Sequence, residues 1–154
     1  MQVDQEQILT ASRELWTAQL GLTVAPPVAA DGDQEKRWAS CVKISGAWQG
    51  AILLECSESI LRHAAATLFA ADGEDTPEDE LQDAIKELAE MFGKKLRPYL
   101  PGEIKISRPS IVEDETSCKA LNGMLGLSEL KMSCEGRPVR IVLFEAQPDM
   151  AATG

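Results

Sequence analysis

The chain has few aromatic residues and no long apolar run. Phe, Trp and Tyr make up only 5% of its 154 residues. The longest uninterrupted apolar stretches, such as AILL and IVLF, are far shorter than the roughly 20 residues that a transmembrane helix needs. The N-terminal sequence MQVDQEQILT also lacks the basic and apolar regions of a secretory signal. We therefore expect a cytoplasmic protein with no membrane span.

Basic residues are in the minority. Lys and Arg number 15 against 25 Asp and Glu, which gives a net charge of -10 and a pI near 4.6. A field of this sign repels phosphate backbones and anionic lipids, so nucleic acid and membrane surfaces are excluded as main partners. The charge suits a protein partner that carries basic groups or a metal ion.

Residues that bind zinc are scarce and badly spaced for it. His63 is the one histidine, and the four cysteines, Cys41, Cys56, Cys118 and Cys134, form no C-x-x-C pair. We expect no metal site. Three of the cysteines, all but Cys118, lie in apolar strand patterns and are predicted to be reduced core thiols. The phosphate-binding glycine motifs and the G-x-S-x-G motif are missing too, so no cofactor of the protein's own is expected.

Length favours a single domain over residues 1–154, with a connector at 21–37 and a flexible tail at 147–154. Hydrophobic periodicity predicts the elements in between. In chain order they are a helix from about Gln5 to Leu20, strands in WASCVKIS and WQGAILLEC, helices in SESILRHAAATLFA and from Thr76 to Pro98 or Pro101, and strands in EIKISRP, LSELKMSC and RPVRIVLFEA. This order, α-β-β-α-α-β-β-β, indicates an α/β (α+β) fold in which helices cover an antiparallel-rich sheet.

For each of the two central helices, the hydrophobic period predicts which residues are buried and which are exposed. In the first, the predicted inner face is Ile60, Leu61, Ala64, Leu68 and Phe69. In the second, the predicted buried stripe is Leu81, Ile85, Leu88, Phe92, Leu96 and Tyr99. Off that stripe, Asp83, Glu87 and Glu90 recur at i, i+4 and i+7, and like charges at such spacing cost a few tenths of a kcal/mol each. Lys94, four residues after Glu90, gives partial pairing. The row should face solvent or a partner.

Two interpretations of the acid row follow from the residues alone. It is either idle solvated surface or a working site. Paired carboxylates also serve glycoside hydrolysis, but that chemistry needs an aromatic-rich sugar cleft, which a chain so poor in aromatic residues does not favour.

The segment DAIKELAEMFGKKL, which starts at Asp83, resembles the signature of the CheX and CheC type chemotaxis phosphatases. In that signature an Asp or Ser is followed after three residues by Glu and after two more by Asn. The preceding GAWQGAILLECSESILRHAAATLFA and the following LRPYLPGEIKISRPSIV are similar to the flanking elements of CheX-like domains. The likeness spans roughly residues 38–112.

This resemblance implies a CheX-like fold that binds a phosphorylated response-regulator receiver, CheY-like, and hastens hydrolysis of its aspartyl phosphate. Mg²⁺ is then expected on the partner receiver, and the family likeness is the ground for expecting a homodimer. Asp83 matches the family's leading Asp, and Glu87 matches the Glu that pairs with the receiver's active-site lysine. Glu90 stands where the family has Asn, whose amide orients the attacking water. The implied catalytic residues are Glu87 and Glu90, with Asp83 and Lys94 joining them in partner binding.

The exchange of Asn for Glu90 bears on activity. A carboxylate about 4 Å from a phosphoryl charge meets a repulsion on the order of 4 kcal/mol at an effective dielectric of 20, before any relief from the receiver's metal ion. That corresponds to roughly a thousandfold in rate. Three hypotheses therefore stand: a receiver-binding domain with weakened phosphatase activity, a phosphatase in which Glu90 replaces Asn in function, and a non-enzymatic binding or dimerisation module.

Overall fold

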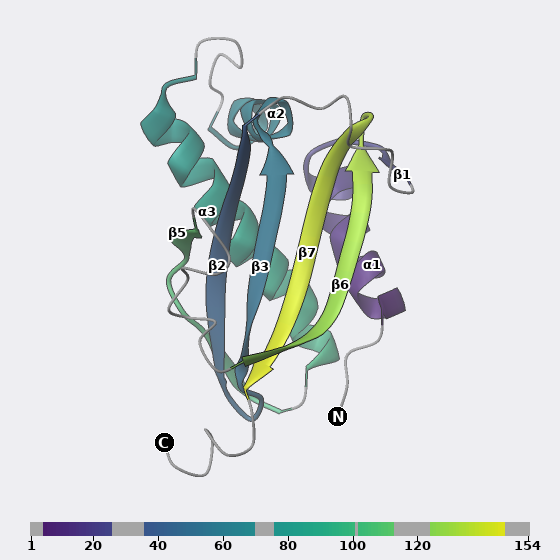
Figure 1. Ribbon diagram of the computed structural model, residues 1–154, viewed down its shortest axis with the longest axis vertical. Helices are drawn as coiled ribbons and strands as arrows, with labels where there is room; N and C mark the ends of the chain where they lie inside the picture. Colours follow the sequence, from purple (N-terminus) through teal and green to yellow (C-terminus); the bar gives the residue numbers. More distant parts are fainter. Residues whose placement is uncertain (1–4, 26–35, 70–75, 101, 113–123, 147–154) are drawn as a thin grey trace.

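A single antiparallel sheet, with helices against one of its faces, organises the protein (Figure 1). The computed structural model describes residues 5–25, 36–69, 76–100, 102–112 and 124–146. Within these ranges seven strands form the sheet in the order β1-β6-β7-β3-β2-β4, and β5 pairs with β2 beside β4. Helices α1, α2 and α3 lie together behind the sheet in the view of Figure 1. The predicted fold class is confirmed.

The described residues form helices and strands in the following chain order. Their bounds are α1 (Gln5–Arg13), the π-helical turn η1 (Glu14–Gln19), β1 (Val24–Ala25), β2 (Arg37–Gly46), β3 (Gly50–Ser57), α2 (Glu58–Phe69), α3 (Glu78–Leu96), the 3-10 turn η3 (Arg97–Tyr99), β4 (Ile104–Ile106), β5 (Ser110–Val112), β6 (Met124–Cys134) and β7 (Arg137–Ala146). None of the helices in the described ranges is both long and apolar enough to span a bilayer.

The predicted connector at 21–37 is wrong at both of its ends. Val24 and Ala25 form β1 and pair with β6, and Arg37 already belongs to β2. A strand of two residues has no readable alternation, and its hydrogen-bond partners lie far along the chain, so local pattern does not reveal it. β5 was missed for the same reason. The middle of the connector and the predicted tail at 147–154 lie outside the described residues.

Two hairpins set the register of the central strands. β2 and β3 pair antiparallel across the turn that starts at Gly46, as their alternating sequences predict. β6 and β7 meet at Glu135 and Gly136, which have φ values of 51° and 78°. Two successive left-handed residues are the signature of a type I′ turn, whose twist matches that of the strands it joins.

The main core lies between the sheet and the helices. Trp48, Ile52, Leu54 and Cys56 of the β3 region point into it, as their alternation predicts. The opposite face of the sheet holds a second, smaller buried cluster: Ala39, Cys41, Ala51, Leu53, Val112, Val142 and Phe144. Because both faces of β3 are buried, this strand is apolar at every position from Ala51 to Leu54 rather than at every second one.

Helix α3 spans the middle of the main core. Its predicted stripe from Leu81 to Leu96 is buried, although Tyr99 beyond the helix is only half-buried. Acidic residues occupy the first turn and Lys94 and Lys95 the last, which suits the helix dipole at both ends. Burial of this stripe turns the polar face of α3 outward.

The three cysteines that the structure describes, Cys41, Cys56 and Cys134, are buried thiols in the core, as predicted. Cys118 lies outside the described residues. Burial raises the pKa of the Cys134 thiol from its ordinary 9.0 to about 12, with the Glu135 carboxylate adding to the effect. Burial likewise raises the pKa of Cys56, and the nearby Cys134 adds to it. Both thiols are therefore packing groups.

Candidate functional site

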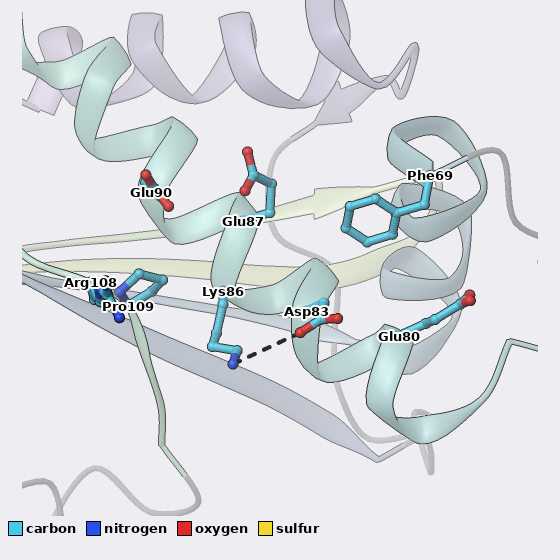
Figure 2. A pocket seen from close by; sticks show the side chains of 8 residues that line it. All are labelled: Phe69, Glu80, Asp83, Lys86, Glu87, Glu90, Arg108 and Pro109. Atoms are coloured by element: carbon cyan, nitrogen blue, oxygen red, sulfur yellow. Dashed lines mark ion pairs between the residues drawn. The ribbon is translucent and has the colours of Figure 1, made fainter.

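The outward face of α3 borders a hollow of about 690 Å³ (Figure 2). The residues that line it are Phe69, Glu80, Asp83, Lys86, Glu87, Glu90, Arg108 and Pro109. Asp83, Glu87 and Glu90, singled out from the sequence, thus share one surface. Lys94 does not line it: this lysine lies one turn further along and is exposed. His63 also lies elsewhere, with its Nε2 2.9 Å from the Leu20 carbonyl oxygen.

The three acids of the row differ in their partners. Asp83 Oδ1 lies 3.9 Å from Lys86 Nζ, and Glu90 Oε1 lies 3.7 Å from Lys94 Nζ. Glu87, which is half-buried, takes part in none of the ion pairs or hydrogen bonds found among the described residues. Because an exposed ion pair is worth at most about 1 kcal/mol, Asp83 and Glu90 are held only loosely. Within the described part of the chain, Glu87 has no ion pair that an approaching cation would have to displace.

Phe69 borders the hollow on the α2 side, with its ring turned toward the acids of α3 (Figure 2). The side chain is 43% exposed, and it is the exposed large hydrophobic residue of the described chain. The prediction that Phe69 belongs to the inner face of α2 is therefore wrong. Phe69 is the last residue of α2, where the helix has run past the core that buries Leu61 and Ala64.

Arg108 and Pro109 border the hollow on the side away from Phe69 (Figure 2). They belong to the short link between β4 and β5. Arg108 is exposed, and no ion pair or side-chain hydrogen bond found among the described residues engages its guanidinium. The sequence analysis did not identify Arg108, because no local pattern in a link between two strands indicates that the link lies beside α3.

Ser107 holds this link against β2. The Lys43 N–H donates to Ser107 Oγ at 2.8 Å, and the Ser107 N–H donates to the Lys43 carbonyl at 2.8 Å. The same hydroxyl donates to the Arg108 carbonyl at 3.1 Å. Pro109 restricts the residue before it to extended conformations. The residues on both sides of Arg108 thus restrain its backbone, while its side chain makes no ion pair with the described residues.

The hollow is polar but does not resemble a metal centre. Four carboxylates and two cations line it, and no cluster of His, Cys, Asp and Glu suited to hold a metal ion occurs among the residues that the structure describes. One oxygen of Glu80, Oε2, is buried without a hydrogen-bond partner. Its place in the first turn of α3 lets the helix dipole stabilise the carboxylate. Such a surface can bind a partner site that contains both positively and negatively charged groups.

Solved structures of chemotaxis proteins are similar to this chain. CheX from Desulfovibrio desulfuricans matches with a TM-score of 0.67 and 14% identity, over 91% of this chain and 97% of that one. CheX from Vibrio vulnificus matches with a TM-score of 0.65 and 14% identity, over 91% and 94%. The CheX–CheY–BeF3–Mg²⁺ complex from Borrelia burgdorferi matches with a TM-score of 0.60 and 14% identity, over 92% and 97%. These matches show a shared fold.

No curated protein matches the sequence. The family model of the chemotaxis phosphatase CheX does, over residues 38–123. That range runs from β2 through α3 and β5, so it contains α2, α3 and the link that line the hollow. The chain therefore belongs to the chemotaxis phosphatase CheX family.

Proposed function

We propose that this protein binds the phosphorylated receiver domain of a CheY-like response regulator through the hollow on α3, and that it promotes hydrolysis of the receiver's aspartyl phosphate slowly. Family membership and the CheX–CheY complex of Borrelia burgdorferi support the choice of partner. The observation that carries the proposal is that Glu87, between Asp83 and Glu90 in the hollow, has no ion-pair partner among the described residues.

Glu87 is the docking group. A lysine of the receiver's active site can donate to its carboxylate, which no cation of this chain occupies among the contacts of the described residues. A hydrogen bond between charged groups contributes about 1.5–3 kcal/mol. Loss of Glu87 should therefore lower the affinity about 10- to 100-fold.

Hydrolysis requires a water oxygen to attack phosphorus as the bond to the aspartate oxygen breaks, which releases inorganic phosphate and restores the aspartate. Positioning and charge stabilisation account for most of the catalysis of such a step. Glu90 lines the hollow, and by the resemblance of the sequence it stands where the family has Asn. Its negative charge opposes the phosphoryl oxygens, whereas Mg²⁺ on the receiver partly offsets that repulsion. The rate is accordingly low.

The test measures binding and turnover with CheY-like receivers from the same organism. Wild type should bind at least one receiver that carries BeF3 and Mg²⁺, and Glu87→Lys should abolish that binding. Glu103→Lys is the matched control, because it makes the same charge change at an exposed glutamate that does not line this hollow. It should bind like wild type.

Release of phosphate from a phosphorylated receiver is the second measurement. Wild type should release it only slightly faster than the receiver does alone. If no receiver binds above background, or if both Lys variants bind as well as wild type, the proposed function is wrong.

A further inference from the structure

We infer that Arg108 is the residue that makes receiver binding depend on phosphorylation, by pairing its guanidinium with the phosphoryl group. This inference rests on the proposed function. It assigns to the link between β4 and β5 a role that the acid row of α3 does not supply, namely attraction of the anionic part of the partner's site.

The charges of the hollow single out Arg108. Two cations line it, Lys86 and Arg108, and Lys86 is held by Asp83 at 3.9 Å. Lys94 lies outside the hollow and is held by Glu90 at 3.7 Å. Within the described part of the chain, the Arg108 guanidinium has no such carboxylate. It is the cation that can pair with an incoming anion without first giving up a partner.

The position of Arg108 fits the same task. In Figure 2, Arg108 lies toward the Glu90 end of the hollow, away from Phe69. A phosphoryl group brought to Glu90 by docking at Glu87 thus arrives where the hollow also has a positive charge. Because Glu90 repels that group, an opposite charge nearby is needed if phosphorylation is to favour binding at all.

Arginine is the side chain that suits this contact. Its planar fork of donors matches two phosphoryl oxygens at once, which a point charge such as lysine does not. The backbone of the link is held by the two hydrogen bonds between Ser107 and Lys43, so ordering the side chain is the main entropic cost of the contact. Because Arg108 is exposed, its replacement should leave the fold intact.

The experiment compares affinities for one receiver with and without BeF3, in the presence of Mg²⁺. The affinity of wild type for the receiver with BeF3 should be about tenfold or more above its affinity for the receiver without it. One charge-assisted hydrogen bond contributes a free energy of that size. Arg108→Ala should lose that preference and keep the affinity for the bare receiver, whereas Arg108→Lys should restore part of it. Arg13→Ala, an exposed arginine at another groove, is the control and should behave like wild type.

Outcomes separate this inference from the proposed function. If Glu87→Gln weakens both forms and Arg108→Ala retains the full preference for BeF3, the role of Arg108 is refuted and receiver binding stands. If Arg108→Ala weakens both forms equally, the arginine is a general docking residue and the inference is also refuted. If wild type binds neither form, the proposed function fails and the inference fails with it.

Discussion

Glu87 and Glu90 are residues of the same type, on the same helix, in the same hollow, with different surroundings. Glu90 lies within reach of Lys94, and Glu87 has no partner among the described residues. The pair with Lys94 is solvent-exposed and therefore weak, so it does not neutralise Glu90 toward a phosphoryl group. At the scale of single residues, the proposed low activity depends on this one carboxylate.

Replacing Glu90 by Asn tests that dependence. The neutral amide removes the repulsion and can both donate to and accept from the attacking water. We expect Glu90→Asn to release phosphate from a phosphorylated receiver about 10- to 1000-fold faster than wild type. The measurement is the initial rate of phosphate release at saturating receiver.

Glu90→Gln is the matched control for charge, since it is equally neutral but one methylene longer than Asn. It should show a smaller rise, because positioning of the water suffers. A fall in rate with Asn would instead show that Glu90 acts on the water itself, and the charge argument would then be wrong.

At the scale of elements, the site depends on how α3 is attached to the sheet. Ser40 of β2 is fully buried, and its hydroxyl donates to the Ile85 carbonyl of α3 at 2.6 Å. A Cβ on Gly93 would lie 3.3 Å from Ile106, so the glycine lets α3 approach β4 closely. These two contacts bring the acid row of α3 close to the link that carries Arg108.

Ser40→Ala should lower the free energy of unfolding by about 1 kcal/mol, because a buried hydrogen bond is lost while the Ile85 carbonyl keeps its place in the helix. For a domain of this size the melting temperature should fall by about 2–4 °C. Thermal and urea unfolding measure both quantities. The control is Ser45→Ala on the same strand, where the serine is exposed and the change should be near zero. Equal effects of the two substitutions would contradict the proposed attachment.

At the scale of the whole molecule, buried thiols link stability to alkaline pH. The pKa of Cys134 is raised from 9.0 to about 12 in the folded protein. Between these values the unfolded chain loses the proton and the folded chain keeps it. Stability is therefore fully present below about pH 9 and declines as pH rises toward 12, by up to about 1.4 kcal/mol per pH unit.

Cys134→Ala should make that decline shallower. Urea unfolding at several pH values from 8 to 10.5 measures the slope of the unfolding free energy against pH. Val139→Ala is the control for the cavity, since Val139 is buried on the adjacent strand and its side chain does not titrate. This substitution should lower the free energy of unfolding equally at every pH. Parallel slopes for wild type and Cys134→Ala would refute the linkage.

The fold was largely predictable because its main elements have local signatures. The 3.6-residue stripe of α3 and the apolar segments that form β2, β3 and β7 appear in the sequence, and most of their apolar residues are buried. The two short strands were not predictable. Their pairing partners are distant in the chain, as in the pairing of Val24 with Cys134. The likeness to the CheX family extended the prediction to a residue row that periodicity alone leaves without a role.

Sequence alone determined that Asp83, Glu87 and Glu90 share the polar side of a helix, because the spacing along a helix fixes which residues lie on one face. Tertiary structure alone decided what surrounds that row. Phe69 became exposed because α2 ends beyond the core, and Arg108 reached the same hollow because β4 and β5 both pair with β2. Such placements depend on contacts between segments far apart in the chain, which no local pattern encodes.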